Sequence, residues 1–169
     1  MVAQKSKESD VPPEPGDFTG EWDPELIRRI VTLGRPIYKL WFRSEVRGLD
    51  QFPDGGALIV SNHSGGINPP DVPIFWVDFF EKFGYDRPIY TLTHDLILRG
   101  RLIGPFTRMG MIRATRENAN KALRSGATVI VFPGGDYDAL RPTSKQSTID
   151  FDGRTGYVST AIEAGGPIV

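Results

Sequence analysis

His63 is the residue in this sequence best suited to acid–base chemistry. It follows a short apolar run rich in branched side chains, residues 57–60, and precedes a glycine-rich loop. A histidine at the carboxyl end of a buried strand lies where α/β sheets bind ligands, and imidazole titrates near neutral pH. Asn62, Asn68 and Asp71 are close enough in the chain to hydrogen-bond one ring nitrogen. The other nitrogen is then available to take a proton from a hydroxyl.

Two plainer interpretations compete with this one. A single histidine is more often structural than catalytic, and Asp71, which precedes Val72-Pro73, is also suited to capping a helix. Ser64 is no evidence for a nucleophile, because adjacent side chains on an extended backbone point to opposite faces.

Several common catalytic and cofactor motifs are missing from the sequence. It contains no Gly-x-Ser-x-Gly, no Walker loop and no Gly-x-Gly-x-x-Gly, which argues against the commonest serine hydrolases and nucleotide-binding folds. With no cysteine and 2 histidines, the chain has no recognisable spacing of metal ligands. We therefore predict neither a metal site nor a bound cofactor.

Charge is balanced overall but unevenly distributed. The 169 residues carry a formal net charge of −1, which does not indicate a nucleic-acid partner. Seven acidic residues fall within residues 1–25, whereas seven basic residues against one acid fall within 97–124. The basic segment is a candidate for binding anions.

The chain divides into three parts by its patterning. Residues 1–22 mix acids and prolines with few apolar positions, which predicts a flexible leader. Residues 23–45 predict an amphipathic helix that begins at Asp23-Pro24. Residues 46–169 alternate strand-like and helix-like segments, which predicts an α/β domain with a mixed, mostly parallel sheet flanked by helices. Because the chain ends within an apolar segment, we expect it to be truncated at its C-terminus.

The expected strands are short. They lie within residues 46–54, 57–60, 88–92, 111–112, 127–132 and 165–169. No apolar run approaches the roughly 18 to 20 residues that a membrane-spanning helix needs, so we expect any membrane contact to be peripheral.

The helix expected over residues 25–43 allows two interpretations. Its basic positions form a narrow stripe, while apolar side chains, with Trp41 near the end, cover more than one core-facing face. This pattern is typical of a helix lying in a membrane interface. The alternative is a core-packed amphipathic helix kinked by Pro36.

Four blocks resemble those of the glycerolipid acyltransferases in order and approximate spacing. They are Asn62-His63, Gly110 to Arg116, Val131 to Gly135 and Ala164 to Val169. That superfamily includes the lysophosphatidic acid acyltransferases and the diacylglycerol acyltransferase type 2 branch. The resemblance covers residues 46–169.

The resemblance implies a mechanism and a set of site residues. His63 would be the general base that deprotonates a glycerolipid hydroxyl for attack on the thioester of acyl-CoA or acyl-carrier protein, with Asp71 as its partner. Arg116 would hold an acceptor phosphate or headgroup. The residues implied in substrate binding are Asn62, Asn68, Gly110, Arg113, Arg116, Phe132, Pro133, Gly134 and Gly135.

The sequence departs from the family pattern in two blocks. The pattern His-x-x-x-x-Asp would place a carboxylate at position 68, where this chain has asparagine; either Asn68 or Asp71 orients the imidazole, and we favour Asp71 for its charge. The pattern Phe-Pro-Glu-Gly-Thr-Arg is altered, with Gly134 in the glutamate place and Tyr137 in the arginine place. This favours a monoacylglycerol or diacylglycerol acceptor over a small phosphorylated one.

The prediction is a peripheral, monotopic membrane acyltransferase on the cytoplasmic face, whose partners are a lipid acceptor, an acyl thioester donor and the membrane surface. One rival is a lipid-binding protein that has kept the fold and lost turnover. Another is a thioesterase or esterase that uses the same histidine to activate water.

Overall fold

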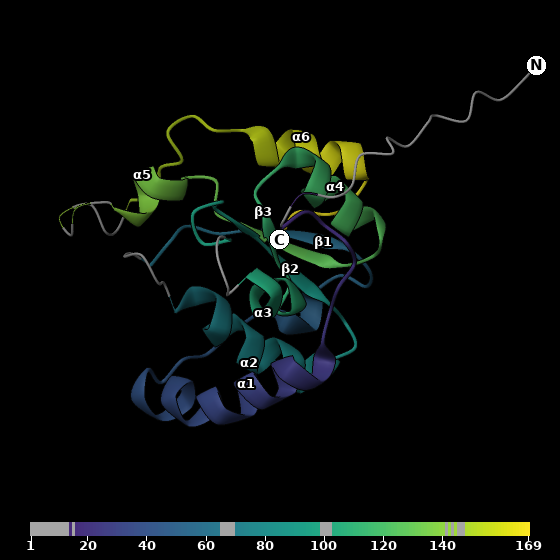
Figure 1. Cartoon of the computed structure of the whole chain (residues 1–169). Coiled ribbons are helices and arrows are strands. Elements are labelled where there is room, and N and C mark those ends of the chain that lie inside the picture. The colour runs from purple at the N-terminus through teal and green to yellow at the C-terminus, as the bar shows by residue number, and fades with distance from the viewer. Residues whose placement is uncertain are drawn as a thin grey trace, which may run out of the picture.

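The computed structural model has a β-sheet with helices on both faces (Figure 1). It describes residue 14 and residues 16–64, 70–98, 103–140, 142, 144 and 148–169. Residues 1–13 of the predicted leader and the predicted site residue Asn68 lie outside this part of the chain. The predicted α/β class is confirmed.

All strands of the sheet run parallel, in the order β1-β4-β2-β3. They are β1 (Ala57–Val60), β2 (Ile89–Thr93), β3 (Met111–Arg113) and β4 (Thr128–Val131). Near the C-terminus, Ile168 adds one parallel bridge to Leu58, on the outer side of β1. Because parallel strands share one direction, the loops that follow them meet at one edge of the sheet, which we call the carboxyl edge.

Helices cover both faces of the sheet. In Figure 1, α1 and α2 lie below the sheet, and α4 and α6 lie above it. The helices are α1 (Pro24–Pro36), α2 (Asp71–Phe83), α3 (Ile103–Arg108), α4 (Arg116–Arg124), α5 (Gly135–Ala139) and α6 (Gly156–Ala164).

The alternation of strand side chains divides the core into two clusters. Ile89 belongs to the cluster that contains Phe80 of α2, whereas its neighbour Tyr90 belongs to the cluster that contains Ala122 of α4. Successive side chains of a strand point to opposite faces, so a single buried strand supplies both clusters.

The N-terminal helix is partly buried and partly exposed. Asp23 caps α1 by accepting a hydrogen bond from the backbone N–H of Leu26 at 2.9 Å, as Asp23-Pro24 predicted. Ile27 and Val31 are buried against α2, so the core-packed interpretation holds for this face. After Pro36 the chain continues as a π-helical segment, η1 (Ile37–Trp41). No helix in the described ranges is long and apolar enough to span a bilayer.

The strand predicted within residues 46–54 is wrong. This segment is a loop that contains a short 3-10 helix, η2 (Leu49–Gln51). The backbone N–H of Val46 donates to the Asp78 side chain at 2.8 Å rather than to a neighbouring strand. Gly48 has a φ of +84°, which turns the chain out of an extended path.

The boundary predicted between leader and folded domain also differs from the structure. Phe18 packs edge-on against Tyr90, with ring centroids 4.9 Å apart, and the Trp22 indole N–H donates to the carbonyl of Tyr85 at 2.8 Å. Residues before 23 are therefore part of the packed structure. Two aromatic residues in an otherwise polar segment thus contact the core.

Candidate active site

His63 lies at the carboxyl edge, three residues after β1 ends. Phe132 follows β4, the strand that pairs with β1. The two rings stack face to face, with centroids 4.2 Å apart and an interplanar angle of 8°. The structure thus brings together two residues from sequence blocks predicted to share a site, and Phe132 restricts the orientation of the imidazole.

Asp138 is a further site residue, one that the sequence did not single out. Its side chain is fully buried on α5 and accepts a hydrogen bond from the backbone N–H of His63. Since α5 starts directly after the Pro133-Gly134 turn, its first turn returns to the carboxyl edge. The order of the elements could have indicated this residue. Because β1 and β4 are parallel neighbours, carboxylates that follow β4 lie near the residues that follow β1.

Gly134 is required by the position of Asp138. A Cβ atom at residue 134 would lie 2.3 Å from the Cβ of Asp138. A larger residue at position 134 would displace the buried carboxylate of Asp138. Arg154 closes the turn from outside, donating to the carbonyl of Gly134 at 2.9 Å and more weakly to that of Pro133 at 3.4 Å.

Gly135 completes the turn between β4 and α5. It has a φ of +52°, and its N–H donates to the carbonyl of Phe132 at 3.0 Å. The predicted tight turn over residues 132–135 is therefore present, directly beside the His63 ring.

Asp71 supports the loop on the other side of His63. It is the first residue of α2, and its carboxylate accepts a hydrogen bond from the backbone N–H of Ser64 at 2.9 Å. The expectation that Asp71 caps α2 is wrong, because Pro70 occupies the cap position and, among the described residues, no side-chain capping hydrogen bond forms there. The Asp71 carboxylate is instead committed to the backbone next to the histidine.

Asn62 acts on the local backbone as well. Its side-chain amide donates to the carbonyl of His63 at 3.3 Å. Two carboxylates and one amide therefore hydrogen-bond the backbone of two consecutive residues, His63 and Ser64. This support fixes where the imidazole emerges from the chain.

Burial lowers the pKa of His63 below its ordinary value of 6.5. Desolvation of the half-buried ring is the largest cause, and the negative charges of Asp138 and Asp71 act in the opposite direction. A histidine with a lowered pKa is neutral at pH 7. It can therefore accept a proton, as a general base must.

The predicted residues of the second block lie at the other side of the sheet. Arg113 ends β3, which is separated from β1 by β4 and β2, or three strand spacings of about 4.8 Å each. Arg113 is held by Glu14 and Asp95, whereas Arg116 is exposed at the start of α4. Both reach the carboxyl edge, but neither is adjacent to His63 along the sheet.

Glycine is required at position 110 for a structural reason. Its φ is +79°, and a Cβ atom there would lie 2.3 Å from the carbonyl oxygen of Ile89. Its own carbonyl accepts the N–H of Thr91 at 2.8 Å. Gly110 therefore allows β3 to start against β2, and the structure gives it no contact with the region around His63.

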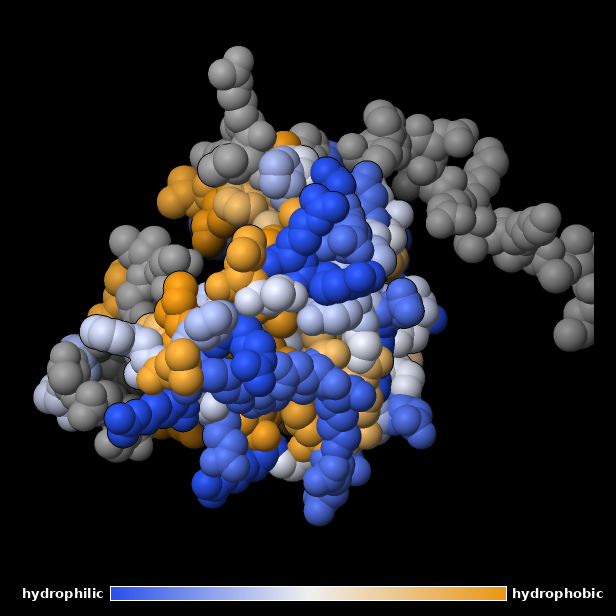
Figure 2. Space-filling model, turned by 90° about the horizontal axis from the view of Figure 1, so that it is seen from below, coloured by the Kyte–Doolittle hydropathy of each residue, from blue (hydrophilic) through white to orange (hydrophobic). Residues whose placement is uncertain are grey.

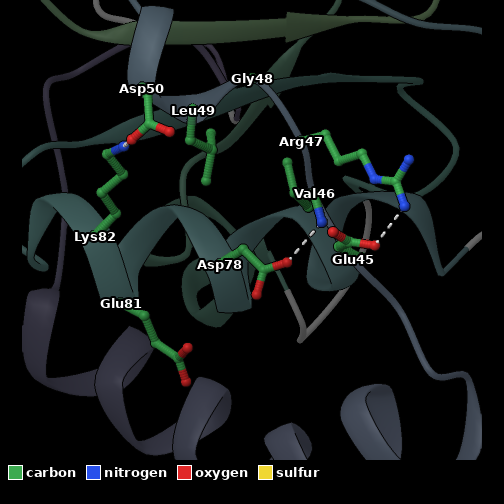
Figure 3. A pocket seen from close by; sticks show the side chains of 9 residues that line it. All are labelled: Glu45, Val46, Arg47, Gly48, Leu49, Asp50, Asp78, Glu81 and Lys82. Atoms are coloured by element: carbon green, nitrogen blue, oxygen red, sulfur yellow. Dashed lines mark hydrogen bonds and ion pairs between the residues drawn. The ribbon is translucent and has the colours of Figure 1, made fainter.

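A surface hollow of about 540 Å³ lies away from these residues (Figure 3). It is lined by residues 45–50 and by Asp78, Glu81 and Lys82 of α2. Its charges are paired, Lys82 with Asp50 and Arg47 with Glu45. Nowhere in the described ranges do three or more His, Asp or Glu side chains gather in a way that would hold a metal ion.

Comparison with known proteins connects this arrangement to a family. The family model described as Acyltransferase matches residues 43–169. An uncharacterized protein of Mycobacterium tuberculosis is 32% identical over 160 residues, covering 91% of this chain and 44% of the relative. Proteins named "DGAT1/2-independent enzyme synthesizing storage lipids" are 28% identical in Mus musculus and 29% in Homo sapiens, each match covering 88% of this chain and 44% of the relative.

The chain therefore spans less than half the length of these relatives. No solved structure matches it. The family model covers most of the chain, including the loop that carries His63 and the turn that carries Phe132. The chain belongs to the Acyltransferase family.

Proposed function

We propose that this chain transfers a fatty acyl group from a thioester, acyl-CoA or acyl-carrier protein, to a hydroxyl of a glycerolipid. The observation that carries the proposal is the half-buried imidazole of His63, stacked on Phe132 and fixed through its backbone by Asp138. Burial lowers the pKa of this ring, which suits it to accept a proton. Membership of the Acyltransferase family supports the reaction type, and relatives named for storage-lipid synthesis support a lipid acceptor such as monoacylglycerol, diacylglycerol or a lysophospholipid.

In the proposed reaction His63 takes the proton of the acceptor hydroxyl as its oxygen attacks the thioester carbonyl. The tetrahedral intermediate collapses by breaking the carbon–sulfur bond, and the imidazolium returns the proton to the leaving thiolate. One ester and one free thiol result, with no covalent enzyme intermediate. Asp138 and Asp71 stabilise the transient imidazolium by their charges.

We also propose that the protein works at a membrane surface, bound peripherally on the cytoplasmic face. Ion pairs of Arg35 with Glu81 and of Lys39 with Asp78 show that α1 and η1 run antiparallel to α2. The chain after Lys39 therefore heads toward Asp71 and the carboxyl edge. The exposed apolar side chains of this stretch are Leu33, Ile37, Leu40, Trp41 and Phe42.

Further apolar side chains are exposed after β2 and around α5. Those after β2 are Leu96 and Ile97, and those around α5 are Tyr137 and Leu140. Figure 2 shows hydrophobic groups gathered toward the side of the molecule on which α5 lies in Figure 1. Apolar groups near the carboxyl edge would bring a lipid acceptor to His63 directly from the bilayer.

The test is product detection by mass spectrometry. The protein and its His63→Ala variant are incubated with palmitoyl-CoA and vesicles that contain monoacylglycerol, diacylglycerol or a lysophospholipid. An acylated lipid formed by the natural chain and lost in the variant supports the proposal. Free fatty acid formed without any acceptor would favour hydrolysis, and vesicle binding without consumption of the thioester would favour a non-catalytic lipid-binding role.

A further inference from the structure

The acidic and the basic segments of this chain lie against each other. We call Glu14 together with residues 16–23 the acidic strap. Its carboxylates pair with cations of the segment that the sequence indicated for anion binding. The pairs are Glu14 and Asp17 with Arg113, and Asp23 with Arg108.

Backbone hydrogen bonds fix the strap on the free edge of β3. The N–H of Arg113 donates to the carbonyl of Gly16 at 2.8 Å, and the N–H of Asp23 donates to the carbonyl of Arg108 at 3.1 Å. The N–H of Phe18 donates to the buried side chain of Asn118 at 3.0 Å. The strap is therefore packed against the fold by specific hydrogen bonds.

Gly16 shows how closely the strap covers Arg113. A Cβ atom at residue 16 would lie 2.9 Å from the Cγ of Arg113, and the φ of +87° favours glycine. The contact places the strap directly on the aliphatic part of the arginine side chain, with the Glu14 carboxylate at its guanidinium group.

All three nitrogens of the Arg113 guanidinium group have carboxylate partners. Nε donates to Asp95 at 3.0 Å, Nη2 donates to the same carboxylate at 3.3 Å, and Nη1 binds Glu14. Asp17 lies 3.8 Å from Nη1. Three acids thus surround one cation, and the local charge is negative although the surrounding sequence is basic.

Arg116 provides the contrast. It lies three residues after Arg113 at the same edge, it is exposed, and within the described part of the chain it makes no ion pair or hydrogen bond. Lys121 and Arg124 of the same helix have partners, the Glu117 carboxylate and the Glu163 carbonyl. The strap therefore neutralises Arg113 and leaves Arg116, the other arginine at the β3 end of the carboxyl edge, exposed.

We propose that the acidic strap acts as a built-in counter-ion that excludes phosphate monoesters from Arg113. This inference rests on the function proposed above, because it assigns that site a selectivity for acceptors without a phosphate monoester. A dianionic phosphate would have to displace Glu14 and would be repelled by Asp17 and Asp95. A hydroxyl or ester group meets neither obstacle.

The experiment removes the strap's charges while keeping its shape. In the Glu14→Gln/Asp17→Asn variant, we expect glycerol 3-phosphate to bind at least about tenfold more tightly than it binds the natural chain, as measured by isothermal titration calorimetry. The matched control is Glu45→Gln/Asp50→Asn, which removes the same number of charges from exposed ion pairs beside α2. Binding gained equally by the control would overturn the proposal, since net charge alone would then explain it.

Arg113→Gln in the strap variant supplies the second comparison. The gained binding must be lost when Arg113 is replaced; binding that survives this change overturns the proposal. Circular dichroism and the melting temperature show whether each variant is folded, and if the double variant unfolds, single Asp17→Asn is measured in its place, with the same direction expected.

An activity arm distinguishes this inference from the proposed function. In the strap variant, the rate with lysophosphatidate relative to monoacylglycerol should rise, and the KM for palmitoyl-CoA should stay constant. A changed donor KM with an unchanged acceptor ratio would overturn the inference. If neither chain acylates any acceptor, the proposed function fails, and the glycerol 3-phosphate binding decides on the strap alone.

Discussion

The backbone N–H of His63 donates a hydrogen bond to the carboxylate of Asp138, a residue 75 positions later in the chain with no exposed surface. The bond joins the loop after β1 to the first turn after β4. It holds the candidate general base beside Phe132, and the imidazole stacks on the Phe132 ring. Asp138 thus fixes the backbone of this histidine, and Phe132 contacts its ring.

Replacing Asp138 should destabilise the protein. In Asp138→Ala the His63 N–H loses a buried, charged acceptor, and we expect the free energy of unfolding in urea to fall by about 2 to 3 kcal/mol. Asp136→Ala on the same short helix is the control, because that side chain is 84% exposed. Equal losses in the two variants would contradict the role given to Asp138.

His63→Ala should abolish acyl transfer without unfolding the chain. Loss of a general base costs about 10² to 10⁴ in rate, and kcat should carry the loss. His94→Ala is the matched control, since His94 is the other histidine, is exposed, and its ring accepts the N–H of Leu96 at 3.1 Å. Activity retained in His63→Ala would exclude the proposed mechanism.

The pH dependence should report the His63 environment. Because burial lowers the pKa of His63, kcat/KM should reach its acid half-point below pH 6.5 and be constant at neutral pH. The Asp71 charge raises this pKa, so Asp71→Asn should move the half-point further toward acid while the asparagine oxygen keeps the bond to Ser64. A shift toward alkaline pH, or the same shift in Asp50→Asn, would contradict this assignment.

Membrane binding should depend on the exposed row of α1 and η1. The Leu40 side chain is 77% exposed, and burying a leucine in lipid is worth about 1.5 to 3 kcal/mol. Leu40→Ser should therefore weaken sedimentation with phospholipid vesicles about tenfold or more. Ile162→Ser on α6, where the side chain is 75% exposed, should leave binding unchanged.

Gly110 should be sensitive to any side chain, for a reason separate from substrate binding. Gly110→Ala should lower the free energy of unfolding by at least about 2 kcal/mol, because the new methyl group would meet the Ile89 carbonyl. Gly48→Ala has a similar positive φ with open space around it, so it should cost only about 1 kcal/mol. Denaturant unfolding measures the loss of stability in both variants. The difference between the two losses is the cost of the steric clash with Ile89, since both variants share the strain of a positive φ.

Periodicity and composition alone determined much of this fold. The branched apolar runs at residues 57–60 and 127–132 predicted β1 and β4, and Asp23-Pro24 predicted the start of α1. These features are local: a strand that is buried on both faces needs continuous apolar residues, and a helix start needs a side-chain acceptor. The four blocks likewise identified the family, because their order along the chain carries that information.

The partners of each charged group were decided only by the tertiary structure. No local pattern relates Glu14 to Arg113 or His63 to Asp138, since these pairs form when segments 75 to 99 residues apart are brought together by the sheet order. The same holds for Asp71, for which the sequence suggested the His63 ring or a helix cap as partner. In the structure its carboxylate accepts the backbone N–H of Ser64. Charge acts through space, whereas sequence reports only proximity along the chain, so the acidic leader and the basic segment could be recognised separately but not as a pair.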